Sequence, residues 1–442
     1  MTKLGRLPLA LLAMTALSAC GIFKGGDKKT PVLGDRVPIL VAESDSAVDT
    51  NLAGQQVLLP PPAPNSDWTQ PGGNAAKSMG HPALGAQLSR AWSVPIPGGT
   101  TRVRLAAAPV VAGGRLYVSD VNGAVHALDS ATGATLWRVD TARGKGNESA
   151  RFGGGVSISP EENRLYATNG VGDVVALNIA DGSEIWRKKP GGPLRGAPTV
   201  ANGQLYVLTQ DNQLFALSTA DGSTVWTQSG SLEAQGVFGV AAPASAQGTV
   251  VAGFSSGELN AYRYENGRTV WGDSLSRTSI STSVSALADI DAEPVIDNGR
   301  VYAVGQGGRM VALEILSGQR LWEQNIAGIS TPWVIGEWIF VVTDDARMLC
   351  ISRGNGRIRW ISQLPRWRNE KSKKGPIRWT GPVLAGGQLH VVSSEGAIAA
   401  VSPDTGTIGT QIATKSNFTL SPIVVDSTLY VLDDSGQLSA YR

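Results

Sequence analysis

From residue 107 onward, short apolar runs alternate with turn residues in a pattern that repeats along the rest of the chain. The first copy has four such runs, at residues 108–111, 114–118, 123–128 and 133–137. Gly, Asn and Asp separate these runs, which have the length of strands in a buried sheet. Each copy of the pattern therefore predicts one blade of four antiparallel strands.

The fourth run of the first six copies contains the sequence Gly-x-x-x-Trp. The Trp residues are spaced by 38 to 51 positions when the seventh copy, which ends in Thr410, is included. That spacing is typical of propeller blades. We expect the Gly to form a turn with positive φ and the indole to pack between adjacent blades. The blade with Thr410 should then be the weakest. The six Trp residues are Trp137, Trp186, Trp226, Trp271, Trp322 and Trp360.

An eighth copy begins at Ser421 and stops at Arg442, before its fourth strand. Residues 90–94, upstream of the first blade, have the composition of the missing strand. An N-terminal strand that completes the last blade would close the ring and protect two sheet edges. The sequence therefore predicts an all-β fold, a closed eight-bladed β-propeller of four-stranded antiparallel blades over residues 67–442.

The chain begins like an exported lipoprotein. Lys3 and Arg6 precede an apolar run at residues 7–17, which is too short to span a bilayer and matches a secretory signal. The following Ser-Ala-Cys resembles the lipobox of bacterial lipoproteins. That resemblance implies a signal peptide at residues 1–19, lipid attachment at Cys20 and, because residue 21 is not Asp, sorting to the outer membrane.

Residues 20–66 show no sustained hydrophobic period and contain a proline-rich run at residues 60–64. We expect a flexible tether that spans roughly 35 Å. The only other cysteine is Cys350, which we interpret as a small buried apolar residue without a disulfide partner. The formal charge is +2, and removal of the signal peptide leaves it near zero, so nucleic acid is not an expected partner.

Catalytic motifs do not fit the repeat. Residues 253–257 match Gly-x-Ser-x-Gly, but they fall on a turn between two strands and lack the helix that a nucleophile elbow needs. The three histidines, His81, His126 and His390, have no zinc-ligand spacing. We therefore predict no catalytic, metal-binding or cofactor-binding residue, and a protein that is not an enzyme.

Residues 127–137 resemble the tryptophan-docking motif of the pyrroloquinoline quinone dehydrogenases. That resemblance implies an eight-bladed propeller, with a quinone and calcium in the central funnel and oxidation of alcohols or sugars. The chain lacks the adjacent Cys-Cys pair of many such enzymes and shows no convincing Glu, Asn and Asp cluster for calcium. A quinoprotein dehydrogenase stays as one alternative, and another periplasmic propeller interaction protein as a second.

The lipobox, the tether and the eightfold repeat together resemble the BamB family of outer-membrane assembly lipoproteins. The likeness is most specific at residues 287–294. It implies a non-catalytic scaffold on the periplasmic side of the outer membrane that aids β-barrel folding and insertion. The implied partners are the periplasmic domains of BamA and other subunits of the assembly machinery, with unfolded β-barrel clients as further candidates.

Asp289 and Asp291 are the predicted partner-binding residues. They lie in a long connection between blades, and residues i and i+2 of an extended segment point the same way. We expect two exposed carboxylates that receive a basic group of the partner, or alternatively a turn in which they bind local amides. Phe238 is the predicted apolar anchor of a companion loop. The family motif Leu-Arg-Gly at residues 194–196 comes one blade too early, and we interpret it as a coincidental match.

A cluster of basic residues lies between the sixth and seventh blades. It is either a solvated loop or a patch for an acidic partner or anionic lipid. Its members are Arg366, Arg368, Lys371, Lys373, Lys374 and Arg378.

Overall fold

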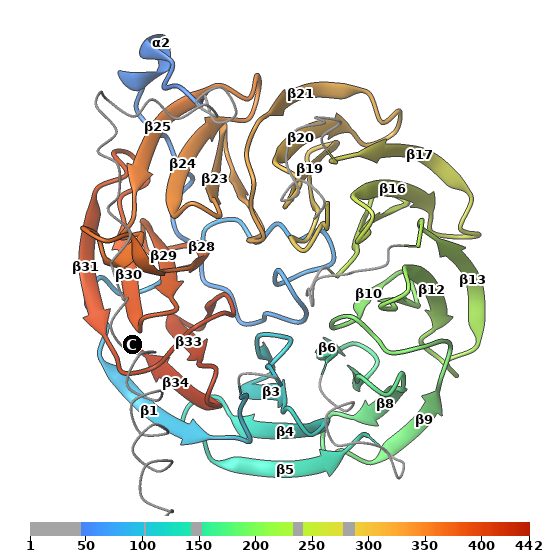
Figure 1. The fold of residues 1–442 in the computed structure, drawn as a ribbon. Helices are drawn as coiled ribbons and strands as arrows, with labels where there is room; N and C mark the ends of the chain where they lie inside the picture. Colours follow the sequence, from blue (N-terminus) through green and yellow to red (C-terminus); the bar gives the residue numbers. More distant parts are fainter. Residues whose placement is uncertain (1–45, 101–102, 143–152, 233–241, 277–287) are drawn as a thin grey trace, which may run out of the picture. The chain divides into compact units, whose positions relative to one another are not determined.

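The computed structural model describes residues 46–442 apart from 101–102, 143–152, 233–241 and 277–287. In the described residues, eight antiparallel sheets of four strands each are arranged around the centre of the ring, which we call the channel (Figure 1). The first strand of each sheet lies nearest the channel and the last lies at the rim. The predicted eight-bladed propeller is confirmed.

Blades 1 to 4 are each built from four consecutive strands. Blade 1 contains β2 (Val110–Ala112), β3 (Arg115–Ser119), β4 (Ala124–Asp129) and β5 (Thr135–Asp140). Blade 2 contains β6 (Val156–Ser159), β7 (Arg164–Thr168), β8 (Val174–Asn178) and β9 (Glu184–Lys188). Blade 3 contains β10 (Thr199–Ala201), β11 (Gln204–Leu208), β12 (Gln213–Ser218) and β13 (Thr224–Ser229). Blade 4 contains β14 (Ala244–Ala246), β15 (Thr249–Gly253), β16 (Glu258–Arg263) and β17 (Thr269–Ser274).

Blades 5 to 7 follow the same order. Blade 5 contains β18 (Val295–Asp297), β19 (Arg300–Gly305), β20 (Arg309–Glu314) and β21 (Arg320–Gln324). Blade 6 contains β22 (Trp333–Ile335), β23 (Trp338–Val342), β24 (Arg347–Ser352) and β25 (Ile358–Gln363). Blade 7 contains β28 (Trp379–Ala385), β29 (Gln388–Ser393), β30 (Ala397–Val401) and β31 (Ile408–Ala413).

Blade 8 joins the two ends of the propeller. It contains β32 (Ile423–Val425), β33 (Thr428–Leu432), β34 (Gln437–Tyr441) and, from the N-terminal side, β1 (Arg90–Pro95). β1 pairs antiparallel with β34, with Val94 opposite Leu438. The predicted closure by an N-terminal strand is confirmed: β1 covers the edge of β34 and takes the outer position that the fourth strand has in the other blades.

The tryptophans hold neighbouring blades together as the sequence predicts. In blade 1 the Trp137 ring lies 5.7 Å from the Tyr117 ring, and its indole N–H donates to the carbonyl of Ile179 in blade 2 at 3.3 Å. A Cβ at Gly182 would meet the Trp137 ring at 2.7 Å, and Gly182 has φ of +75°. Glycine is therefore needed there both for space and for backbone conformation.

Residues 46–66 differ from the tether that the sequence predicts. This segment contains α2 (Thr50–Ala53) and lies against the propeller. The Val57 amide donates to Asp404 at 3.0 Å, and the Asn65 side chain donates to the carbonyl of Val424 at 2.7 Å. The prediction that the tether extends to residue 66 is therefore wrong for residues 46–66. The propeller surface supplies the hydrogen bonds that a proline-rich run cannot make within itself. A tether would have to lie before residue 46, outside the described residues.

The chain then enters the middle of the ring (blue in Figure 1). Trp68 stacks on Trp333 with ring centroids 6.3 Å apart, and its backbone pairs with Val111. The segment between Trp68 and β1 thus partly fills the channel. Cys350 is buried in β24, as predicted, and burial raises the pKa of its thiol.

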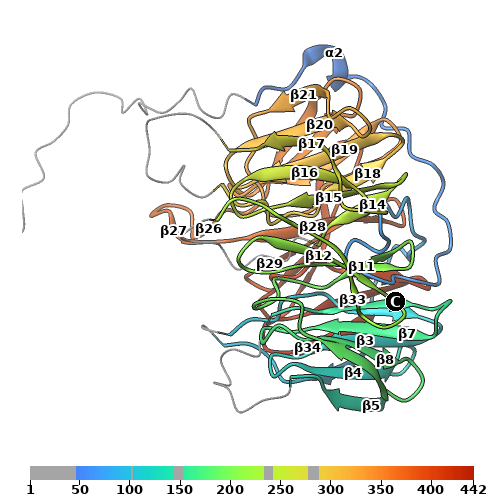
Figure 2. The same ribbon diagram turned by 90° about the vertical axis from the view of Figure 1, so that its right-hand side faces the viewer.

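The two faces of the ring carry different features. On one, the connection face, the last strand of each blade leads to the next blade. Between β25 and β28 this face carries an added hairpin of β26 (Trp367–Asn369) and β27 (Lys374–Pro376), which contains the predicted basic cluster. Figure 2 shows this hairpin projecting from one side of the ring, whereas the segment that follows α2 (blue) runs along the opposite side. No helix among the described residues is long and apolar enough to cross a membrane.

Candidate partner-binding site

Asp289 and Asp291 lie in the connection between β17 and β18, on the connection face. Their side chains are only 2% and 7% exposed. The prediction of two exposed carboxylates is therefore wrong. The backbone around them is fixed to the neighbouring blades, since the Ile290 amide donates to the carbonyl of Phe254 at 3.2 Å and the Gln306 amide donates to the carbonyl of Asp289 at 2.9 Å.

Arg195 is the residue that both carboxylates contact. It lies in the connection between β9 and β10, and its Nη2 donates to Asp289 and, at 2.8 Å, to Asp291. The two Asp side chains thus point the same way, as the sequence predicts. The interpretation of Leu-Arg-Gly at residues 194–196 as a coincidental match is wrong. Although 94 residues separate Arg195 from Asp289, the ring brings the entries of blade 3 and blade 5 together.

The Arg195–Asp289–Asp291 cluster is buried and carries one positive and two negative groups. Burial and the charge of Asp289 raise the pKa of Asp291 to about 6, while Arg195 opposes this shift. Among the described residues, neither Nε nor Nη1 of Arg195 has a hydrogen-bond acceptor, although both are buried. Buried guanidinium donors without acceptors are costly, so a further acceptor would stabilise this arginine.

Apolar side chains are exposed near other blade connections of the same face. Leu232, which follows β13, is 78% exposed, and Ile329, which precedes β22, is 40% exposed. The connection face therefore combines a buried charged cluster with apolar side chains available to a partner. Two predicted site residues, Phe238 and the lipid-attachment residue Cys20, lie outside the described residues.

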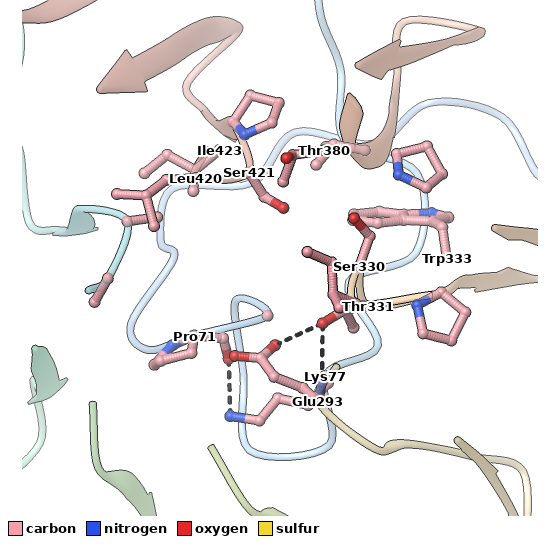
Figure 3. A pocket seen from close by; sticks show the side chains of 18 of the residues that line it. Pro71, Lys77, Glu293, Ser330, Thr331, Trp333, Thr380, Leu420, Ser421 and Ile423 are labelled. Atoms are coloured by element: carbon pink, nitrogen blue, oxygen red, sulfur yellow. Dashed lines mark hydrogen bonds between the residues drawn. The ribbon is translucent and has the colours of Figure 1, made fainter. Parts of the chain in front are cut away.

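The centre of the channel holds two buried ionisable side chains, Lys77 and Glu293, which sequence reasoning missed. Lys77 donates to the carbonyl of Pro71 at 2.8 Å (Figure 3). It also donates to Thr199 at 3.1 Å. Glu293 accepts from the hydroxyl of Thr331 at 3.4 Å. Burial lowers the pKa of Lys77 to about 8 and raises that of Glu293, and each charge opposes the shift of the other. A cavity of about 130 Å³ lies beside them.

The channel holds a segment of this chain. The segment that carries Lys77 runs through it, and the described residues contain no group of three or more His, Cys, Asp or Glu that could hold a metal ion. The Gly-x-Ser-x-Gly match lies in the turn between β15 and β16, where the Ser255 hydroxyl donates to Asn212 at 2.9 Å. The structural interpretation of that motif is therefore confirmed.

The closed ring and the tryptophan contacts between blades define the class of this protein, an eight-bladed β-propeller of quinoprotein-like repeats. A family model described as "Outer membrane protein assembly factor BamB" matches residues 85–150 and 121–362. The chain belongs to this BamB family.

Curated relatives support the same assignment over most of the chain. The outer membrane protein assembly factor BamB of Yersinia pestis is 29% identical over 358 residues, which cover 80% of this chain and 88% of the relative. The protein of the same name from Shigella dysenteriae is 30% identical, over 78% of this chain and 86% of the relative. That from Escherichia coli is 29% identical, over 78% and 86%.

Solved structures show the same fold. BamB from Moraxella catarrhalis aligns with a TM-score of 0.68 at 18% identity, over 80% of this chain and 100% of that one. A quinohemoprotein alcohol dehydrogenase from Comamonas testosteroni aligns with a TM-score of 0.64 at 15% identity, over 86% and 81%. Because the two proteins differ in chemistry, the propeller alone does not distinguish scaffold from enzyme.

Proposed function

We propose that this protein is a non-catalytic scaffold of the outer-membrane β-barrel assembly machinery. Its curated relatives are named outer membrane protein assembly factors, and they align over most of their length. The lipobox at Cys20 supports attachment to the outer membrane through lipid, facing the periplasm. The channel supports a scaffold over a quinoprotein enzyme, because the segment that carries Lys77 runs through the space in which the quinone would bind.

The scaffold docks on the periplasmic domains of BamA through the connection face. The observation that carries this proposal is the contact of Arg195 with Asp289 and Asp291, since these are the residues that match the family's docking motifs. The buried ion pairs fix two connections from different blades in one arrangement. Leu232 and Ile329 offer apolar contacts to a partner on the same face.

The test is a binding measurement between the lipid-free mature chain and the periplasmic domains of BamA. Arg195→Ala is expected to weaken binding by about tenfold or more, as for a residue at the centre of an interface. The matched control is Arg353→Ala, because Arg353 is also buried and forms an ion pair, with Asp297 at 2.6 Å, but in the turn between β24 and β25 at the opposite face of the ring. Circular dichroism and urea denaturation check that both variants are folded.

The control should bind like the wild type. Equal loss of binding by both variants would show that the effect comes from weakened folding, and unchanged binding by Arg195→Ala would refute docking through this cluster. Co-purification of the intact lipoprotein with the assembly machinery from detergent-solubilised membranes tests the scaffold role separately. A stoichiometric complex with the quinone and calcium that oxidises alcohols would instead support the dehydrogenase.

A further inference from the structure

Seven of the eight blade junctions described by the structure are filled in the same way. In each, an indole N–H of one blade donates to a backbone carbonyl of the next blade. The acceptor residue lies three positions before the glycine in the turn between the third and fourth strands. Trp92 of blade 8, for example, donates to the carbonyl of Ser130 in blade 1 at 3.2 Å and packs on Gly133. The same bond is made by Trp137, Trp186, Trp226, Trp271, Trp322 and Trp360.

The junction between blades 7 and 8 departs from this pattern at three positions. In blade 7, Gln411 of the fourth strand lies opposite Ala399 of the third, and in blade 1 Arg138 lies opposite His126 in the same way. Thr410 therefore stands at the position of Trp137. His390 stands where blade 1 has Tyr117, since each pairs with the equivalent Ala of the third strand. Leu88, four residues before Trp92, replaces the turn glycine. By the same count Gly85 stands at the position of the indole acceptor, on the segment that leads into β1 because no turn joins β34 to β1 in blade 8.

These replacements leave a cavity of about 340 Å³ at the junction. An apolar cavity of about 150 Å³ is enough to bind benzene in a protein, so the space suffices for an indole even with Leu88 beside it. His390 is buried at the inner wall, whereas Gly85 and Thr410 are exposed at the opening. Burial lowers the pKa of His390 to about 4, so its ring is neutral near pH 7 and can stack against another aromatic ring.

A second cavity, of about 510 Å³, continues from the first and shares Leu88 and Ile412 with it. Its lining includes the cations Arg90 and Lys415 and one acid, Asp433. The Asp433 carboxylate already accepts from the Gln437 amide at 2.8 Å and from Ser435 at 2.7 Å. The two cations therefore favour a ligand with negative charge beside the aromatic group.

We propose that the junction between blades 7 and 8 is a binding site for an aromatic side chain, tryptophan above all, carried by an extended peptide segment of another protein with an acidic neighbouring residue. The indole would donate to the carbonyl of Gly85 and stack on His390, so that the partner supplies the ring that seven other junctions take from this chain. The site lies at the rim, away from the Arg195 cluster, and does not depend on the proposed docking on BamA.

The test uses the full mature chain and two probes, N-acetyl-tryptophanamide and the peptide acetyl-Glu-Trp-Thr-amide. Binding is measured by saturation-transfer difference NMR, which detects the ligand and is not disturbed by the protein's own tryptophans. We expect both probes to bind, the peptide more tightly at low salt. A version of the peptide with leucine in place of tryptophan should bind about tenfold more weakly or worse.

Two variants fill the site from within. Thr410→Trp supplies the missing indole, and Thr410→Trp with Leu88→Gly restores the arrangement of the other junctions in case Leu88 obstructs the ring. Both should lose probe binding by about tenfold or more, and the double variant should unfold at a higher temperature than the wild type. The matched control is Gln411→Trp, which adds an indole one residue along on the other face of β31.

The control should bind the probes like the wild type, and all three variants should still bind the periplasmic domains of BamA. The proposal is overturned if the wild type binds neither probe, if the leucine peptide binds equally well, or if the filled variants bind like the wild type. Loss of BamA binding with Arg195→Ala, but not with these variants, keeps the two proposals experimentally separate.

Discussion

Removal of Arg195 should expose the electrostatic cost of burying Asp289 and Asp291. Arg195→Met deletes the guanidinium and keeps much of the apolar volume of the side chain. It leaves two carboxylates, 2% and 7% exposed, without their shared cation. Breaking a buried ion pair from one side typically costs about 3–5 kcal/mol. The cost is limited here, because Asp291 can take up a proton: its pKa is already raised to about 6 with Arg195 present.

We therefore expect Arg195→Met to lower the free energy of unfolding by about 3 kcal/mol at pH 7. The loss should be smaller at pH 5, because each pH unit changes the cost of taking up one proton by about 1.4 kcal/mol. Urea denaturation followed by tryptophan fluorescence at the two pH values measures both quantities. A change in midpoint without a change in slope would show that stability alone has changed.

The companion variant combines Arg195→Met with Asp289→Asn and Asp291→Asn, which removes all three charges. It should recover about 2 kcal/mol of the loss, because no buried charge is left without a counter-ion. A loss below about 1 kcal/mol for Arg195→Met at pH 7 would match an exposed pair and refute this reasoning. The reasoning would also be refuted if the combined variant lost as much free energy of unfolding as the sum of the losses of the separate substitutions.

Three further predictions follow from particular residues. The pKa of Asp291 is raised to about 6 in the folded state, against roughly 3.9 in the unfolded state, so the unfolded state loses its proton first as pH rises. The free energy of unfolding should therefore fall by up to about 3 kcal/mol between pH 4 and pH 6. Urea midpoints should show this fall, and Asp291→Asn should abolish the part of it that comes from Asp291. Trp360→Ala should cost about 3–5 kcal/mol in urea denaturation, because it empties a buried junction and removes the indole bond to Pro403; a cost below 1 kcal/mol would contradict the role of the indole between blades. Reversal of charge at Lys371, Lys373 and Lys374 should weaken binding to the BamA periplasmic domains or to anionic lipid vesicles in a salt-dependent way, and unchanged binding at low salt would leave these lysines as a solvated hairpin.

The sequence by itself determined the eight blades, the closing strand and the role of the tryptophans. These features are local or repeated: alternating apolar residues define strands, glycine and asparagine define turns, and the fixed distance from Gly182 to Trp186 places each indole at a junction. The missing strand of blade 8 could be predicted because β1 has the composition that the repeat requires at that point. The substitution at Thr410 was visible, but the cavity it leaves was not, since that depends on Leu88 from the other end of the chain.

Only the tertiary structure decided which charged groups meet. A count of blades along the sequence places the Leu-Arg-Gly motif too far from Asp289 and Asp291. In the structure the connections between blades converge near the channel, and Arg195 reaches both carboxylates past the connection that leads into blade 4. The partners of Val57 lie far along the chain, so a proline-rich segment that looks unable to order itself is ordered by the propeller surface. Burial of Lys77 likewise follows from the closed ring around it. Repeats encode the blades locally, but contacts across the ring depend on how the ring closes.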